Sequence, residues 1–252
     1  QVGRVGAHPV VVFAGDFQPR PDLLMGIVVD AERALAADPQ GQPSGLGRVR
    51  HGQLSGRGDE IALGFALCAA VLSITSNLSG VGWSWDTSDY VAVGKNFAKD
   101  LTLLDATGLP MTVRPPGLSI LIAVGDWLGL GVNFTVQILN TVSAVIVVLC
   151  TSHLLQLANT RKFVAAMATA FVAFSTALLW QYSMIWSEPP FIAVLMITIV
   201  VSLRKMTASK VMGLIFLFIA LFFVRYVGPV FAVAITAASF LLSLFLTPRE
   251  PI

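Results

Sequence analysis

The sequence predicts an all-α fold: a polytopic transmembrane helix bundle of about six spans, with an amphipathic surface helix in the first extracytoplasmic loop. Only 12% of the 252 residues are charged and 56% are hydrophobic, whereas soluble domains carry about 25% charged residues. Uncharged runs recur along the chain, and several approach the length of about 20 residues that a spanning helix needs. The few charges lie mostly between these runs, as expected when hydrocarbon surrounds the apolar helices.

Two regions of the chain differ in composition. Residues 1–60 mix glycine, proline and charges of both signs, and we expect a weakly ordered cytoplasmic tail or the remnant of a preceding segment. Residues 61–252 carry the apolar runs, and we expect them to form one transmembrane domain. The chain starts at Gln1 and ends just beyond an apolar run. We therefore expect it to be part of a longer protein, with the domain cut short.

Six segments of the second region are expected to cross the membrane. They are apolar except near their ends and cover residues 61–79, 134–156, 163–182, 189–205, 209–225 and 229–247. Another apolar piece, Pro115–Gly125, has only 11 residues. At 1.5 Å per residue it forms about 16 Å of helix, whereas the hydrocarbon core is about 30 Å thick. We expect it to be a re-entrant or surface-lying helix.

The charges between the spans sort by sign. With six spans, one side of the membrane collects most basic residues, among them Arg161, Lys162, Arg204, Lys205 and Lys210. The other side collects a long first loop, Gly80–Asn133, together with Glu188 and Arg225. Loops rich in Lys and Arg stay in the cytoplasm, so this loop is expected on the extracytoplasmic face of a plasma (inner) membrane. Nearly all carboxylates beyond residue 60 share that face, and we expect function there.

The first loop contains an amphipathic helix pattern. Apolar residues recur at steps of three and four, and polar residues fill the opposite face; the two sets are Tyr90, Val93, Phe97, Leu101 and Leu104, and Lys95, Asn96, Lys99 and Asp100. Such a helix is typical of a membrane surface. Asp86, Thr87 and Ser88 stand where helix caps belong. Asp86 and Asp89 are therefore either structural residues of the helix start or candidates for a general base facing a cavity.

Three further charged residues border apolar segments. Arg114 precedes Pro115 and Pro116, whose rigid backbone suits a guanidinium that holds a phosphate, with snorkelling to the interface as an equal alternative. Glu188 is either a helix-start residue near the interface or lines a wet cavity. Arg225 is a candidate partner for Glu188 or for an anionic ligand.

Taken in order, the motifs of residues 61–248 resemble those of polytopic glycosyltransferases of the C-type fold, the superfamily of protein mannosyltransferases and aminoarabinose transferases. A first span is followed by Asp86-Thr-Ser-Asp89-Tyr90, the amphipathic helix and Arg114-Pro-Pro-Gly117. A span with Asn140, then Ser187-Glu188-Pro189, then Phe223-Val-Arg225-Tyr follow. Members of the family usually have more spans, so the chain resembles their N-terminal half.

The resemblance implies an inverting transfer of a sugar from a polyprenyl-phosphate donor to an acceptor hydroxyl, with an aspartate as general base. It assigns catalysis to Asp86, Asp89 and Glu188, and substrate binding to Tyr90, Lys95, Arg114 and Arg225. Many members carry the acid pair Asp-Glu. Here Thr87 replaces the second acid, so the choice between Asp86 and Asp89 as the base stays open.

The expected partners are the lipid-linked sugar donor and membrane lipid. The net charge of +2 gives no reason to expect nucleic acid. These motifs require no cofactor, although a divalent metal is compatible with them; Cys68 and Cys150 lie in apolar runs without metal-ligand spacing. Two alternatives remain: a transporter or lipid flippase that uses the outer charges as its substrate site, and a non-catalytic membrane subunit.

Overall fold

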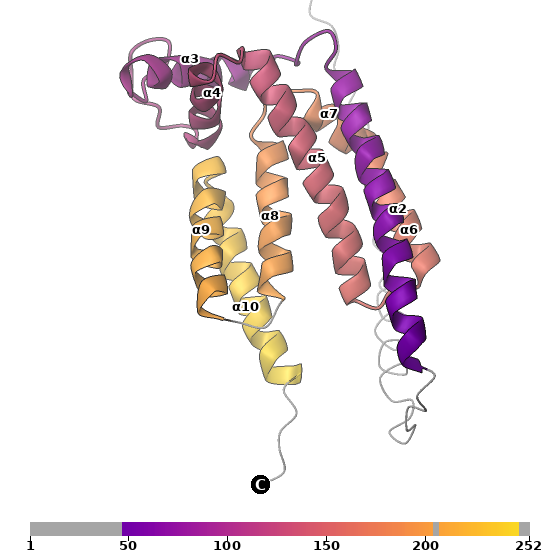
Figure 1. The fold of residues 1–252 in the computed structure, drawn as a ribbon. Helices are drawn as coiled ribbons and strands as arrows, with labels where there is room; N and C mark the ends of the chain where they lie inside the picture. Colours follow the sequence, from indigo (N-terminus) through magenta and orange to yellow (C-terminus); the bar gives the residue numbers. More distant parts are fainter. Residues whose placement is uncertain (1–46, 204–206, 247–252) are drawn as a thin grey trace, which may run out of the picture. The chain divides into compact units, whose positions relative to one another are not determined.

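The computed structural model describes residues 47–203 and 207–246, which form helices and no named strand (Figure 1). The chain divides into two units, Gln1–His51 and Gly52–Ile252, and the site described below lies in the second. Most of the expected N-terminal tail lies outside the described residues. The helices are α2 (Gly47–Ser76), α3 (Trp85–Asp100), α4 (Gly117–Trp127), α5 (Val132–Leu157), α6 (Lys162–Ala173), α7 (Thr176–Tyr182), α8 (Glu188–Ser202), α9 (Ala208–Val224) and α10 (Gly228–Leu246).

Two of these helices are long and apolar enough to cross a membrane: α5 and the Gly58–Ser76 part of α2. The pair α6 and α7 counts as a third if its bend of 42° lies within one span. Ser175 lies at the interruption, where its side chain caps α7 by accepting a hydrogen bond from the Leu178 backbone. The all-α, membrane-type fold is therefore as predicted, with two or three candidate spans by length and composition.

The buried and exposed faces of α2 differ in the size of their side chains. Its buried face carries the small residues Ala62, Ala66, Ala69 and Ser73, whereas Leu63, Leu67 and Val71 are more than half exposed. Ala66 and Ala69 pack with Ala144 and Val148 of α5, and Ser73 bonds Thr141 there. Small residues inside and large apolar residues outside are typical of helices that pack together in lipid.

The amphipathic helix of the first loop is present as α3, but its apolar face is covered by protein. Tyr90 and Val91 share a buried cluster with Leu118 and Ile122 of α4, and Val93 is fully buried. The helices approach closely at Gly94, where an added Cβ would lie 2.9 Å from the Ser119 carbonyl oxygen. The face that was expected to contact the bilayer therefore packs against α4.

Both ends of α3 also differ from the sequence pattern. Its N-cap is Ser84, whose backbone N–H donates to the Thr87 hydroxyl at 2.9 Å, so Asp86 lies in the first turn and does not cap the helix. At the other end Leu101 has a left-handed backbone with φ of 56° and is 67% exposed. Leu101 is therefore not part of the apolar face.

The short helix α4 packs against both α3 and the C-terminal end of α9. Its length is as predicted for the apolar piece after Arg114, and Leu118, Ile122 and Ala123 are buried. The helix begins at Gly117, where an added Cβ would lie 2.5 Å from the Phe223 carbonyl oxygen of α9. Only a glycine lets the two backbones approach in this way.

Replacing Gly117 with alanine is expected to lower the free energy of unfolding by about 1–3 kcal/mol, because the nearest atoms are stiff backbone atoms. Gly213 of α9 is the matched control, since an added Cβ there meets open space among the described residues. Thermal unfolding in detergent, followed by fluorescence-detected size exclusion, compares the two alanine variants. Equal midpoints would contradict the close α4–α9 contact.

Candidate functional site

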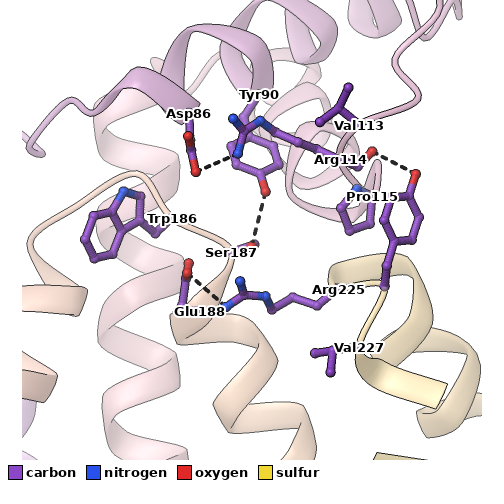
Figure 2. Close-up of a pocket in the computed structure, with 11 residues that line it drawn as sticks. Asp86, Tyr90, Val113, Arg114, Pro115, Trp186, Ser187, Glu188, Arg225 and Val227 are labelled. Atoms are coloured by element: carbon purple, nitrogen blue, oxygen red, sulfur yellow. Dashed lines mark hydrogen bonds and ion pairs between the residues drawn. The ribbon is translucent and has the colours of Figure 1, made fainter. Parts of the chain in front are cut away.

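A pocket of about 220 Å³ lies where the start of α3, the segment after it, the start of α8 and the α9–α10 turn meet (Figure 2). Four of its wall residues are charged, three are aromatic and the rest are small or aliphatic. The wall comprises Asp86, Tyr90, Val113, Arg114, Pro115, Trp186, Ser187, Glu188, Arg225, Tyr226 and Val227.

The two sides of the pocket are joined by backbone hydrogen bonds. Gly82 donates to the Ser183 carbonyl at 2.7 Å, and Ile185 donates back to the Gly82 carbonyl at 3.0 Å, which forms an isolated parallel bridge between Gly82 and Met184. The bridge fixes the start of α3 beside the segment that leads into α8. Asp86 and Glu188 lie a few residues beyond it on their respective segments.

Two buried asparagines donate hydrogen bonds to backbone carbonyls at the start of the segment that leads into α8. Asn140 of α5, which is 1% exposed, donates to the carbonyls of Tyr182 and Met184 at 2.8 and 3.0 Å. Asn77, at the end of α2, donates to the Tyr182 carbonyl at 3.0 Å. Tyr182 is the last residue of α7 and residues 183–187 are not helical, so the Tyr182 and Met184 carbonyls need donors from elsewhere in an apolar surrounding.

Arg114 forms the first charged group of the pocket. Its Nη1 lies 2.6 Å from Asp86 Oδ2, and its Nε donates to Asp89 Oδ2 at 3.0 Å. The guanidinium also lies 5.7 Å from the centre of the Tyr90 ring. Burial acts to lower the pKa of Arg114, but the hydrogen bonds to Asp86 and Asp89 outweigh it and raise the pKa. Arg114 is therefore a permanent cation shared by two carboxylates.

Arg225 and Glu188 form the second charged group. Arg225 Nη1 lies 2.9 Å from Glu188 Oε1, and the two side chains are 39% and 30% exposed. Glu188 is the first residue of α8 and Arg225 is the C-cap of α9, so each charge also suits its helix dipole. Of the two sequence-based alternatives for Glu188, the structure combines both: it starts a helix and it lines the pocket.

The aromatic side chains of the wall form hydrogen bonds to the neighbouring segments of the pocket. The Tyr90 hydroxyl donates to Ser187 Oγ at 3.3 Å, and the Tyr226 hydroxyl donates to the Arg114 carbonyl at 3.1 Å. The Trp186 indole N–H donates to Ser84 Oγ at 2.8 Å. Partly exposed ion pairs contribute at most about 1 kcal/mol each to stability. Stability alone therefore gives little reason for two Arg–carboxylate groups at one pocket.

The structure places five of the seven predicted site residues on the pocket wall: Asp86, Tyr90, Arg114, Glu188 and Arg225. Asp89 is not part of the wall but binds Arg114 Nε, and Lys95 is exposed on α3 and also lies off the wall. Trp186, Ser187 and Tyr226 were not predicted as site residues. Their signal was proximity in the chain, because Ser187 and Tyr226 stand beside a predicted charged residue and Trp186 stands two residues before Glu188.

The structure gives no direct support for a bound metal. Among the described residues, no group of three or more His, Cys, Asp or Glu side chains gathers in a way that could hold one. The carboxylates of Asp86, Asp89 and Glu188 instead bind arginine.

Comparison with known proteins adds no relative. No family model matches the chain, and neither the curated proteins nor the solved structures contain a match. The function has to be inferred from the site itself.

Replacing Asn140 with alanine is expected to cost about 1–3 kcal/mol of stability, because two carbonyls next to the pocket lose a buried donor. Asn133 is the matched control: it lies on the same helix, is exposed, and its alanine variant is expected within about 0.5 kcal/mol of wild type. Thermal unfolding of both variants in detergent checks this difference. A fully stable Asn140 variant would show that the carbonyls find other donors.

Proposed function

We propose that the protein is a membrane glycosyltransferase that moves a sugar from a polyprenyl-phosphate donor to an acceptor hydroxyl. One observation carries the proposal: two Arg–carboxylate groups from four separate chain segments face the same pocket. Each group pairs a carboxylate, which can accept a proton, with a guanidinium, which suits a phosphate. Glycosyl transfer from a lipid phosphate needs both functions at neighbouring positions.

The proposal includes six spans and a pocket at the extracytoplasmic face of the plasma membrane. Each predicted span falls on one helix or on the α6–α7 pair. Helices α3, α4 and α7 lie at the same end of the bundle, where the pocket also lies (Figure 1). Four tryptophans in or beside these helices are more than half exposed: Trp83, Trp85, Trp127 and Trp180. Exposed tryptophan is typical of a membrane–water interface.

In the proposed step, the acceptor oxygen attacks the anomeric carbon from the face opposite the phosphate. The new carbon–oxygen bond forms as the bond to the phosphate oxygen breaks, and the electron pair leaves with the polyprenyl phosphate. Asp86 takes the proton of the acceptor hydroxyl as general base. Its Oδ2 is used by Arg114, which leaves Oδ1 for the proton.

Asp86 suits the base better than Asp89 because it lies on the pocket wall. Asp89 binds Arg114 Nε and is proposed to hold the guanidinium in place. Glu188 has the corresponding role for Arg225 through Oε1, and its second oxygen can also orient the acceptor. Lys95 lies away from the wall, so its proposed contact is with lipid headgroups and not with the reacting atoms.

Arg225 is the better candidate for the departing phosphate. Arg114 is 19% exposed and already binds two carboxylates, whereas Arg225 is 39% exposed and binds one. A phosphate can approach Arg225 and either replace Glu188 as its partner or bind to it beside Glu188. Preorganised cations of this kind stabilise the negative charge that develops on a leaving group.

The membrane orientation can be tested by cysteine labelling. In a background with Cys68 and Cys150 replaced by alanine, Lys95→Cys is expected to react with a membrane-impermeant maleimide in intact cells. Arg161→Cys is expected to react only after permeabilisation. Both positions are exposed in the structure, so accessibility to the reagent reports the side of the membrane. The reverse labelling pattern would overturn the proposed orientation.

Asp86→Asn is expected to lower sugar transfer by about 10²–10⁴-fold, as loss of a general base does. Membranes containing the full-length protein are supplied with radiolabelled polyprenyl-phosphate hexoses and pentoses, and label is counted in the delipidated fraction. Asp89→Asn is expected to have a smaller effect, through Arg114. Asp126→Asn, an exposed carboxylate on α4 away from the pocket, is the matched control and is expected to retain activity.

Transfer that is unchanged in both Asp86→Asn and Asp89→Asn would overturn the catalytic assignment. If no donor is consumed, the same membranes are assayed for movement of fluorescent polyprenyl phosphate between leaflets. Movement that depends on Arg225 without any sugar transfer would favour the transporter or flippase alternative. Neither transfer nor movement, with wild-type stability in all variants, would favour a non-catalytic subunit.

A further inference from the structure

Trp186 occupies a position on the pocket wall that the proposed chemistry leaves without a role. Its indole ring lies between Asp86 and Glu188 on the same side of the pocket, across from Arg225 (Figure 2). The residue is only partly buried, so the ring is neither a core side chain nor fully exposed.

The indole ring is held in a fixed orientation. Its N–H donates to Ser84 Oγ at 2.8 Å, and Ser84 is the N-cap of α3. The neighbours Ile185 and Ser187 are 0% and 3% exposed, so the backbone on both sides of the ring is anchored. Since the polar atom of the indole already has a partner, what the ring offers to the pocket is its apolar face.

The charges around the ring select the kind of ligand that would cover it. The lining side chains Asp86 and Glu188 are each paired with an arginine, so the four charges of the wall balance. A cation would have to compete with two guanidiniums, and a purely apolar ligand would desolvate four charged groups. The part of the ligand that covers the ring is therefore best a neutral group with one apolar face and a hydrogen-bonding edge, and a sugar ring has this character.

We infer that Trp186 is the platform on which the sugar ring of the lipid-linked donor stacks, with Glu188 binding hydroxyls at its edge and Asp86 left for the acceptor. This inference rests on the proposed function, because it assigns the donor sugar to the space between Trp186 and Arg225. The anomeric carbon is bonded to the phosphate oxygen, so a phosphate at Arg225 holds this carbon at the Arg225 end of the sugar and leaves the face opposite the phosphate for the acceptor.

The first test uses Trp186 as its own reporter. Trp83, Trp85, Trp127 and Trp180 are replaced by phenylalanine, which leaves Trp186 as the single tryptophan of the chain; none of the four lines the pocket. The purified protein in lipid nanodiscs is titrated with farnesyl phosphate and with farnesyl phosphate-linked mannose, glucose, galactose and arabinose. At least one sugar-bearing probe is expected to change the Trp186 emission saturably, and farnesyl phosphate is not.

The second test measures the affinity of the same probes for Trp186 variants. Trp186→Leu removes the aromatic face and is expected to weaken the responsive sugar-bearing probe about tenfold, while the affinity for farnesyl phosphate stays unchanged. Trp186→Phe keeps an aromatic face and is expected to stay closer to wild type. Unchanged binding of farnesyl phosphate also shows that the Leu variant is folded.

The outcomes separate this inference from the proposed function. Sugar-dependent emission without any transfer would support the Trp186 platform and contradict the transferase. Transfer that persists in Trp186→Leu with an unchanged KM for the donor would contradict the platform alone. An identical emission change with and without the sugar, or no change with any sugar-bearing probe, would also overturn the platform.

Discussion

The parallel backbone bridge between Gly82 and Met184 is the contact on which the rest of the pocket depends. It joins the segment before α3 to the segment before α8, and these supply Asp86 on one side and Trp186, Ser187 and Glu188 on the other. An added Cβ at Gly82 would overlap the Met184 sulfur and lie 3.1 Å from the Ser183 carbonyl oxygen, so the Met184 side chain would have to move to admit it. The hydrogen bonds of Trp186 to Ser84 and of Tyr90 to Ser187 join the same two segments beside the bridge.

The surroundings of the bridge follow from the scarcity of water in a membrane. A non-helical segment at the end of a bundle exposes backbone carbonyls, and hydrocarbon offers them no hydrogen bonds. Asn140 and Asn77 supply the donors from two different helices. Tyr226, which is 46% exposed, also donates to the Arg114 and Thr112 carbonyls, in the segment before Pro115. Polar side chains here bond an irregular backbone, and the irregular backbone carries the site.

The charged residues of the wall could be predicted from the sequence, but most of the contacts between them could not. Asp86, Arg114, Glu188 and Arg225 were recognisable because charge is rare in this chain and each borders an apolar segment. The Glu188–Arg225 pair was among the predicted alternatives, and the structure contains it. The pairing of Arg114 with Asp86 and Asp89 was not predicted, since it depends on contacts between segments that no local pattern encodes.

The amphipathic pattern of α3 did not show what covers its apolar face, for a related reason. Periodicity identifies an apolar face but not what covers it, and both lipid and a second apolar helix satisfy the same pattern. Two glycines allow the close packing of α4: Gly94 lets α4 approach α3, and Gly117 lets α4 approach α9. The cap was misplaced because Trp85 begins the helix one residue before Asp86, which leaves Ser84 as the N-cap.

The Tyr226 hydrogen bond to the Arg114 carbonyl has a mechanical consequence. Tyr226 follows Arg225 directly, so the two pocket arginines are linked through one short path of backbone and one side chain. Helices in a bilayer tilt and slide as its thickness changes. The same hydroxyl reaches the Thr112 carbonyl at 3.3 Å, so a shift of the turn after α9 would displace the Arg114 segment together with Arg225.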